Sequence, residues 1–209
     1  EQLFESRSWE LKAGGKYFVT RNGSSILAFR IPKTMPVGFQ IMASHSDSPS
    51  FKIKEHPEMR VEGHYIKLNV EKYGGMLMAP WFDRPLSVAG RVIIRNGNHL
   101  ESKLVSVDRD LCMIPNLAIH MNRTANDGYK YNVQKDMLPL YGCGDASEGT
   151  FVQQIADAAD VDVETIVGQD LFLYNRMKGS VWGAGNEFIS IGKLDDLQCA
   201  FSSLWAFLA

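Results

Sequence analysis

Short alternating segments separated by turn residues fill the middle of this chain. Residues 65–70 alternate between apolar and polar side chains, and residues 88–95 form a second such run that ends at Asn96-Gly97-Asn98. Because the side chains of a strand point alternately to opposite faces, this period of two predicts β-structure. Asn-Gly favours a tight turn, and residues 104–107 are the predicted returning strand. This part of the chain is therefore predicted to be rich in β-structure.

Clear helical spacing occurs first at residues 151–159. The apolar side chains there predict an amphipathic helix, with Asp145 or Ser147 near its start as a cap. Residues 171–174 are predicted to form one more strand. No internal repeat or low-complexity linker interrupts the sequence. We therefore expect the β-rich segment to be an insertion into a larger fold.

Two β segments near the N-terminus, residues 16–21 and 26–31, flank Asn22-Gly23-Ser24-Ser25. Asn and Gly tolerate positive φ, so this arrangement predicts a hairpin. Residues 37–43 are apolar enough to form a further strand that is covered on both faces. The end of that predicted strand leads to His45, and strand ends in α/β sheets commonly carry functional side chains.

An imidazole and a carboxylate lie two positions apart at this predicted strand end, on His45 and Asp47. On an extended segment, side chains at positions i and i+2 share one face. A metal-binding histidine needs its second ring nitrogen held by a partner, which is commonly a carboxylate. Taken alone, the pair fits a structural hydrogen bond as well as a metal site, and both interpretations stay open at this point.

Composition and charge exclude several classes of protein. With 209 residues, of which 45% are hydrophobic, the chain can bury the core of one large domain or of two modest ones. A net charge of -2 gives no general attraction to nucleic acid or to anionic membranes. No apolar stretch is long enough to span a bilayer, and no basic segment followed by an apolar run begins the sequence. These features predict a soluble, cytoplasmic protein that binds neither nucleic acid nor membrane.

The three cysteines, Cys112, Cys143 and Cys199, are odd in number and widely spaced, and no Cys-x-x-Cys pair occurs. This pattern argues against a disulfide framework and against a thiolate zinc site. Buried free thiols are the expected alternative.

A second amphipathic helix is predicted at the end of the sequence, where Asp195 and Asp196 follow Gly192. Carboxylates at a helix start are stabilised by the exposed N–H groups and by the helix dipole, so these two residues also fit a purely structural role. No capping Gly, Pro or basic last turn follows before Ala209, and the chain is expected to stop inside this helix. The apolar positions that define the helix are Leu197, Ala200, Phe201, Leu204, Phe207 and Leu208.

Six blocks of the sequence carry a resemblance to a known family. They are Gly14-Gly15-Lys16-Tyr17-Phe18-Val19-Thr20-Arg21-Asn22, His45-Ser46-Asp47-Ser48-Pro49, Tyr73-Gly74-Gly75, Trp81-Phe82-Asp83-Arg84-Pro85-Leu86-Ser87-Val88-Ala89-Gly90-Arg91-Val92, Leu117-Ala118-Ile119-His120-Met121-Asn122-Arg123 and Leu194-Asp195-Asp196-Leu197. In this order, along essentially the whole chain, they resemble the aspartyl aminopeptidases, a family of two-metal exopeptidases. Six blocks in sequence are far more specific than any one of them.

The resemblance implies roles for four residues. His45 matches the family's first metal-ligand histidine. Asp47, the expected catalytic-site residue, matches the acid two positions on that holds that imidazole. Asp195 matches the aspartate that bridges the two metal ions, and the peptide bond between it and Asp196 is often cis in this family. His120 matches a histidine that reaches from an inserted domain into the active site of a partner subunit. A packing role is the alternative for His120.

The resemblance also implies the fold and the activity. The fold class is α/β, with a mixed-sheet zinc-exopeptidase catalytic domain formed by residues 1–68 and 182–209. A β-rich dimerisation domain is inserted at residues 69–181. The implied enzyme is a metalloaminopeptidase that removes N-terminal Asp or Glu residues from peptides, as a homo-oligomer of dimers that assemble further. The complete enzyme carries two Zn²⁺ ions per active site, although cobalt and manganese also suit histidine and carboxylate ligands.

One departure from the family pattern is decisive for what this chain can do alone. In the family, a paired Glu-Glu supplies the general base and one metal ligand, and a further carboxylate and a distal histidine complete the site. None of these follows Asp195, and the sequence holds no adjacent Glu-Glu. The chain thus resembles the N-terminal half of such an enzyme. Because His45 and Asp195 fall short of the three protein ligands typical of catalytic zinc, this segment alone is expected to bind metal poorly. The alternative is a non-catalytic oligomerisation module or an inactive fragment of such an enzyme.

Overall fold

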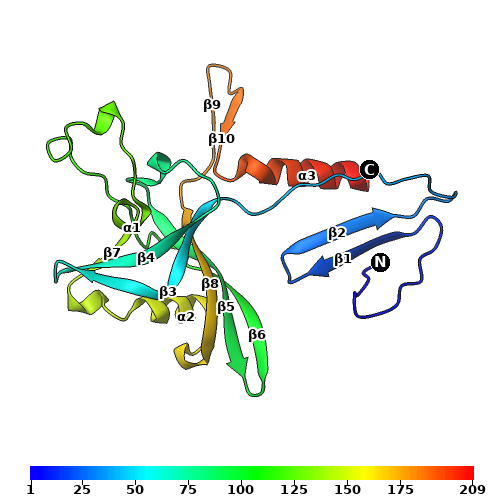
Figure 1. The fold of residues 1–209 in the computed structure, drawn as a ribbon, viewed down its shortest axis with the longest axis horizontal. Helices are drawn as coiled ribbons and strands as arrows, with labels where there is room; N and C mark the ends of the chain where they lie inside the picture. Colours follow the sequence, from blue (N-terminus) through cyan, green and yellow to red (C-terminus); the bar gives the residue numbers. More distant parts are fainter. The chain divides into compact units, whose positions relative to one another are not determined.

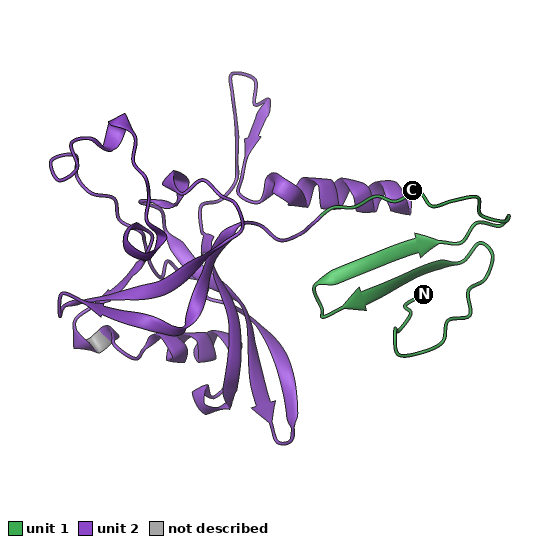
Figure 2. Ribbon diagram, in the orientation of Figure 1, with its two compact units in different colours: residues 1–44 green, residues 45–209 purple. Residues whose placement is uncertain are grey.

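The computed structural model describes residues 1–145 and 147–209 and divides into two compact units (Figure 2). Unit 1 comprises Glu1–Ser44, and unit 2 comprises His45–Ala209. Each unit is described by itself below. His45 and Asp195 therefore belong to the same unit.

Unit 1 is built on the predicted hairpin, with β1 at Lys16–Arg21 and β2 at Ser25–Arg30. The strands pair antiparallel, and Gly23 in the turn has a φ of 63°, so the prediction is confirmed. A small cluster of buried side chains lies against one face of the hairpin. It contains Leu3, Tyr17 and Val19, with Phe29 and Ile31 packed beside them.

The prediction of a buried strand at residues 37–43 is wrong. This segment has no strand structure, and its apolar side chains are exposed, with Phe39 97% exposed. A strand needs a neighbour that satisfies its backbone N–H and C=O groups. Among residues 1–145 and 147–209, no strand pairs with this segment.

A six-stranded sheet dominates unit 2 (Figure 1). Its strand order is β6-β5-β8-β3-β4-β7, and every neighbouring pair in this sheet is antiparallel. The strands are β3 (Ser50–Val61), β4 (Tyr65–Tyr73), β5 (Leu86–Asn96), β6 (His99–Ser106), β7 (Leu140–Cys143) and β8 (Ile166–Asn175). The α/β class is confirmed, with an antiparallel sheet at the centre of unit 2. The mixed sheet of the catalytic domain stays a prediction.

The strands predicted at residues 65–70, 88–95 and 171–174 are confirmed as parts of β4, β5 and β8. The strand predicted at residues 104–107 is confirmed as the end of β6, which stops one residue earlier, at Ser106. The predicted start of the inserted domain, after residue 68, falls inside β4. Strands on both sides of this point belong to one sheet. The division into a catalytic and a dimerisation domain stays a prediction.

Short helical elements connect these strands. The 3₁₀ helices are η1 (Ala79–Trp81), η2 (Ala125–Asp127), η3 (Asp145–Ser147) and η4 (Val163–Thr165), and the α-helices are α1 (Val133–Asp136) and α2 (Phe151–Ala159). The predicted cap of α2 at Asp145 or Ser147 is wrong. A side chain on β3 takes that place, because the Glu58 carboxylate accepts hydrogen bonds from the backbone N–H groups of Gly149 (2.6 Å) and Phe151 (2.7 Å).

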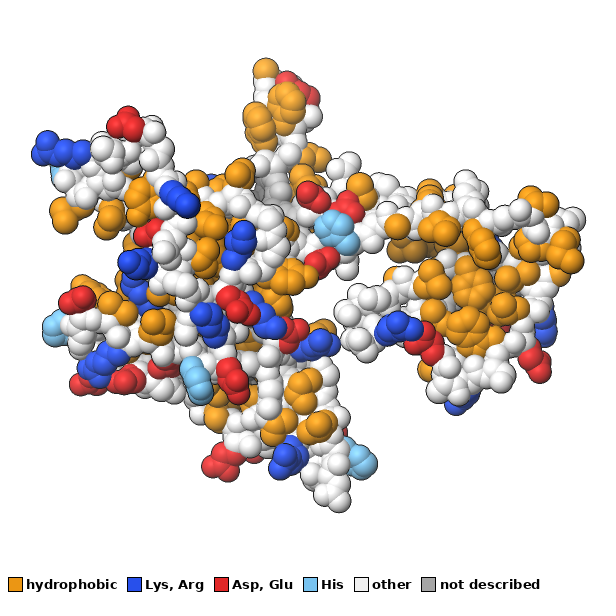
Figure 3. Space-filling model, viewed as in Figure 1, with side chains coloured by type: hydrophobic (Ala, Val, Ile, Leu, Met, Phe, Trp, Pro, Cys, Tyr) orange, Lys and Arg blue, Asp and Glu red, His pale blue; other side chains and the backbone are white. Residues whose placement is uncertain are grey.

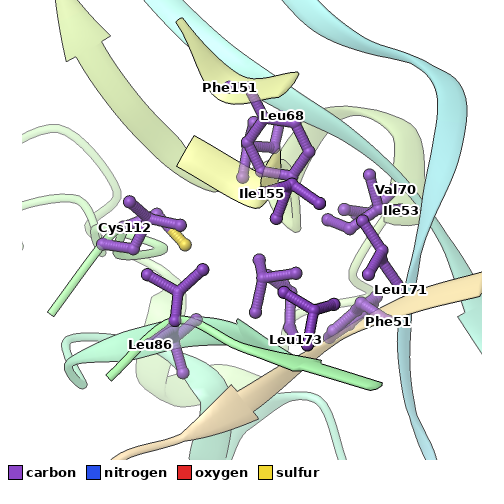
Figure 4. Close-up of a cluster of buried hydrophobic side chains, with 14 of the residues drawn as sticks. Phe51, Ile53, Leu68, Val70, Leu86, Cys112, Phe151, Ile155, Leu171 and Leu173 are labelled. Atoms are coloured by element: carbon purple, nitrogen blue, oxygen red, sulfur yellow. The ribbon is translucent and has the colours of Figure 1, made fainter. Parts of the chain in front are cut away.

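The core of unit 2 lies between the sheet and α2 (Figure 4). Alternate positions of the central strands point into it, as the period of two in the sequence requires. Phe51 and Leu68 are fully buried there, together with Phe151 from α2. Side chains that contribute to this core include Ile53, Val70, Leu86, Val88, Val92, Ile155, Leu171 and Leu173.

The last part of unit 2 contains a second hairpin, β9 (Ser180–Trp182) with β10 (Phe188–Ser190), and then α3 (Leu194–Leu208). The backbone of Asp195 and Asp196 is not helical, and the peptide bond that joins them is cis. The resemblance implied that bond, and the structure confirms it. Apolar side chains lie on the surface of the hairpin (Figure 3), including Val181, Trp182 and Ile189.

All three cysteines are free, in agreement with the prediction, but only Cys112 is buried. Burial raises the pKa of the Cys112 thiol to about 12. Cys143 and Cys199 are exposed, which contradicts the expectation that all three are buried. The described helices include none with the length and hydropathy needed to cross a bilayer.

Candidate active site

The site begins in the irregular segment between the start of unit 2 and β3. This segment, residues 45–49, leads into Ser50, whose buried hydroxyl donates a hydrogen bond to the Leu173 carbonyl of β8 (2.5 Å). Ser50 is also the register partner of Tyr73 at the end of β4. The sheet thus fixes the point at which the segment that carries His45 and Asp47 leaves it.

The structure brings the predicted imidazole and carboxylate together. The Nδ1 atom of His45 lies 3.0 Å from the backbone oxygen of Asp47 and 3.3 Å from its Oδ1 atom. Both oxygens are acceptors, so the neutral ring carries its proton on Nδ1. The Nε2 atom of His45 is then left with a lone pair that can bind a metal ion.

The two aspartates at the start of α3 lie on the Nε2 side of the imidazole. Nε2 is 3.7 Å from Asp195 Oδ1 and 3.8 Å from Asp196 Oδ2. Two hydrogen bonds connect these distant parts of the chain. The backbone N–H of His45 donates to Asp196 Oδ2 (3.1 Å), and the Ser48 hydroxyl donates to the Asp195 carbonyl (3.3 Å).

The two carboxylates differ in exposure and in the partners they already have. The Asp195 side chain is 96% exposed, whereas that of Asp196 is 17% exposed. Asp196 accepts the His45 N–H and a hydrogen bond from the Cys199 thiol. Asp196 therefore acts as a structural anchor between α3 and residue 45, while the Asp195 carboxylate faces solvent.

Hydrogen bonds and neighbouring charges shift the pKa values of His45, Asp47 and Asp196. The pKa of His45 is raised, mainly by the hydrogen bond to the Asp47 carbonyl and further by the three neighbouring carboxylates. The pKa of Asp47 is lowered, mainly because the Tyr73 hydroxyl donates to it. The pKa of Asp196 is lowered by the Cys199 thiol and by the His45 N–H. The site thus places three carboxylates around one imidazole, a charge distribution that favours a cation.

The donors at this site fit part of a zinc shell. Zinc prefers imidazole nitrogen and carboxylate oxygen, and two donors on a tetrahedral ion with bonds of about 2.1 Å lie roughly 3.4 Å apart. The 3.7 Å between His45 Nε2 and Asp195 Oδ1 differs from this by a few tenths of an ångström. Within residues 1–145 and 147–209, however, no group of three or more His, Cys, Asp or Glu side chains is arranged to hold a metal ion.

Three further residues take part in this cluster, and none of them was a predicted site residue. They are Tyr73, Asp196 and Cys199. Tyr73 and Asp196 lie within two of the six quoted blocks, which was the available signal. Cys199 follows its partner Asp196 by three positions. Helical spacing could not have predicted this contact, because the backbone at Asp195 and Asp196 is not helical.

His120 lies outside this cluster, in an exposed turn of the long segment between β6 and α1. In the described part of the chain, no hydrogen bond or ion pair joins His120 to His45, Asp47 or Asp195. Its predicted cross-subunit role is not tested by a single chain.

Comparisons with known proteins extend over the whole chain. The family model described as Aminopeptidase I zinc metalloprotease (M18) matches residues 1–209. A curated protein of Clostridium acetobutylicum, named a probable M18 family aminopeptidase 2, is 46% identical over 210 residues. That alignment covers 97% of this chain and 48% of the relative. The chain thus spans about half the length of the curated relatives it matches.

Solved structures show the same similarity. The structure of mApe1 from Chaetomium thermophilum matches with a TM-score of 0.86 and 31% identity, and the match covers 99% of this chain and 51% of that one. The structure of the S. cerevisiae mApe1 dodecamer matches with a TM-score of 0.78 and 27% identity, over 99% of this chain and 48% of that one.

Proposed function

Because this chain belongs to the M18 family of aminopeptidase I zinc metalloproteases, we propose that it contributes His45 and Asp195 as metal ligands of a zinc aminopeptidase active site. The convergence of these two residues carries the proposal. They are separated by almost the whole length of unit 2, yet their donor atoms lie 3.7 Å apart. Hydrogen bonds from the His45 N–H to Asp196 and from the Ser48 hydroxyl to the Asp195 carbonyl hold the two segments together.

The family description names zinc, and the proposed complement is two zinc ions per active site. When bound, such a pair supplies a nucleophilic water at neutral pH and positive charge for the oxygen of the attacked carbonyl. His45 offers Nε2 as a ligand, and Asp195 offers both carboxylate oxygens, which is what a bridging ligand requires. The paired Glu-Glu that the resemblance implies as general base and ligand has no counterpart in this sequence.

Asp47 is proposed to orient the imidazole and not to bind metal itself. Its backbone oxygen and Oδ1 both face Nδ1 of His45, which fixes the tautomer that leaves Nε2 available. A carboxylate next to an imidazole also raises the basicity of the ligating nitrogen. Asp196 supports the arrangement by holding the backbone of His45 against α3.

We further propose the finer properties that the resemblance implies. The substrates are peptides with an N-terminal Asp or Glu, and the enzyme works as a homo-oligomer in which His120 of one subunit reaches the active site of another. The dodecamer reported for the S. cerevisiae relative supports the assembly. Residues 69–181 are the proposed dimerisation domain, and the proposed location is the cytoplasm.

Zinc binding tests the ligand assignment directly. Isothermal titration of zinc into the complete gene product is expected to reveal about two ions per chain. His45→Ala is expected to weaken binding by at least ~100-fold, more than the loss typical of a residue that only supports a ligand. His99→Ala, an exposed histidine on β6, is the matched control and leaves zinc affinity unchanged.

Equal zinc affinity in His45→Ala and the parent protein would contradict the proposed site. Failure of the complete gene product to bind zinc would instead favour a non-catalytic assembly module. Cleavage assays with peptides that begin with Asp, Glu, Ala or Leu test substrate preference separately. Removal of zinc by a chelator is a further test. The cleavage activity is expected to be lost on chelation and to return when zinc is added.

A further inference from the structure

Tyr73 lies at the point where the sheet meets the candidate site. It is the last residue of β4, and its register partner Ser50 follows Asp47 by three positions. The next residue, Gly74, has a φ of 76°, and a Cβ atom there would lie 3.3 Å from the Cβ atom of Pro49. The end of β4 therefore packs closely against the segment that carries the site.

The ring of Tyr73 is held by the sheet. It packs edge-on against Phe172 of β8, with ring centroids 5.6 Å apart and an interplanar angle of 70°. Such edge-to-face pairs are a favoured geometry for aromatic rings. The position of the Tyr73 hydroxyl is thus set by β4, which carries the residue, and by Phe172 on β8, on the other side of β3.

The hydroxyl donates a 2.7 Å hydrogen bond to Asp47 Oδ2, while the other oxygen, Oδ1, faces His45 Nδ1 at 3.3 Å. Each carboxylate oxygen therefore has its own partner, and rotation of the Asp47 carboxylate would break both contacts. The contacts form a chain from the sheet through Tyr73 and Asp47 to the imidazole.

We propose that Tyr73 is a positioning residue of the metal site, which holds the Asp47 carboxylate in the orientation that aligns the His45 imidazole. The expected consequence is a better placed metal ligand, and this consequence rests on the proposed function. The contact itself does not depend on that function. The role of Tyr73 is exerted through Asp47, because its hydroxyl has no direct contact with His45 among the described hydrogen bonds.

Tyr73→Phe tests this proposal because it removes the hydroxyl and keeps the ring on Phe172. Tyr129→Phe is the matched control, since the Tyr129 hydroxyl also donates to an aspartate, Asp136 (3.2 Å), outside the site. In the complete gene product, Tyr73→Phe is expected to weaken zinc binding by about threefold to tenfold, near the lower end of the range for residues that support a ligand. Tyr129→Phe leaves it unchanged.

A double-mutant cycle separates positioning from a general structural role. Once Asp47→Ala has removed the acceptor, Tyr73→Phe is expected to cause no further loss of zinc affinity. An equal loss in the presence and absence of the Asp47 carboxylate would overturn the proposal. Zinc affinity in Tyr73→Phe equal to that in Tyr129→Phe would also overturn it.

Nitrogen NMR of the His45 ring gives a readout without metal, so it decides the role of Tyr73 even where zinc binding fails. The parent protein is expected to show the neutral ring protonated at Nδ1. Tyr73→Phe is expected to shift the Nδ1 resonance, and Tyr129→Phe to leave it in place. An unchanged His45 ring in Tyr73→Phe would overturn the proposal, whereas absent zinc binding with a shifted ring would refute only the proposed function.

Discussion

The two amphipathic helices α2 and α3 have similar apolar periodicity but opposite surroundings. In α2, Phe151, Ile155, Ala156 and Ala159 are buried against the sheet. In α3, no residue that the structure describes is buried, and Phe201 remains 63% exposed. A helical period therefore identifies an apolar face, but it does not identify what covers that face.

The N-terminal ends of α2 and α3 also differ in what contacts them. The backbone N–H groups of Gly149, just before α2, and of Phe151, its first residue, donate to the Glu58 carboxylate of β3, so the sheet both caps and covers this helix. The residue before α3 is Lys193, in the left-handed conformation with a φ of 69°, and its side chain makes no capping hydrogen bond. The carboxylates of Asp195 and Asp196, at the start of α3, lie within 4 Å of the His45 imidazole instead. One helix start serves stability, and the other carries polar groups of the candidate site.

The largest expected effect comes from removing a core side chain of α2. Phe151→Ala is expected to lower the free energy of unfolding by about 3–5 kcal/mol, because it leaves a cavity in a fully buried position. Phe201→Ala is the matched change on α3, and it is expected to stay within about 0.5 kcal/mol. Urea denaturation of the two variants measures both. Similar losses in both variants would show that α3 is covered in solution.

A smaller effect is expected from the cap that the sheet provides. Glu58→Ala removes the acceptor for the N–H groups of Gly149 and Phe151, and is expected to cost about 1 kcal/mol of unfolding free energy. Glu55→Ala, an exposed glutamate on the same strand, serves as the control. Equal unfolding free energies of Glu58→Ala and Glu55→Ala would mean that the Glu58 cap does not stabilise α2.

The smallest effect is expected on the outer face of α2. Gln153 donates a 2.7 Å hydrogen bond to Asp157, one turn further along the helix. Such pairs contribute about 0.2–0.5 kcal/mol. A double-mutant cycle with Gln153→Ala and Asp157→Ala isolates this coupling from the helix propensity of alanine. A coupling energy above 1 kcal/mol would show that the solvent face of α2 matters as much as its cap.

Much of the strand structure could be predicted because its causes are local. The Asn22-Gly23 turn and the alternation in residues 88–95 specify hairpins through backbone geometry and side-chain direction. The segment 37–43 was predicted wrongly because its composition suits a strand, yet pairing depends on a neighbour elsewhere in the chain. The prediction of the α2 cap was wrong for a similar reason. Glu58 precedes the helix by far more than the few residues that a local cap spans.

The sequence by itself determined the hairpin turns, most strands of the sheet and the amphipathic helices α2 and α3. Through the family blocks, it also indicated the pairing of His45 with Asp47 and the cis bond at Asp195. Only the tertiary structure decided that Asp196 anchors the backbone of His45 and that Tyr73 donates to Asp47. The physical reason is the range of the interactions. Local patterns follow from backbone sterics and side-chain periodicity, whereas hydrogen bonds between distant residues depend on strand order and register, which bring those residues within about 3 Å of one another.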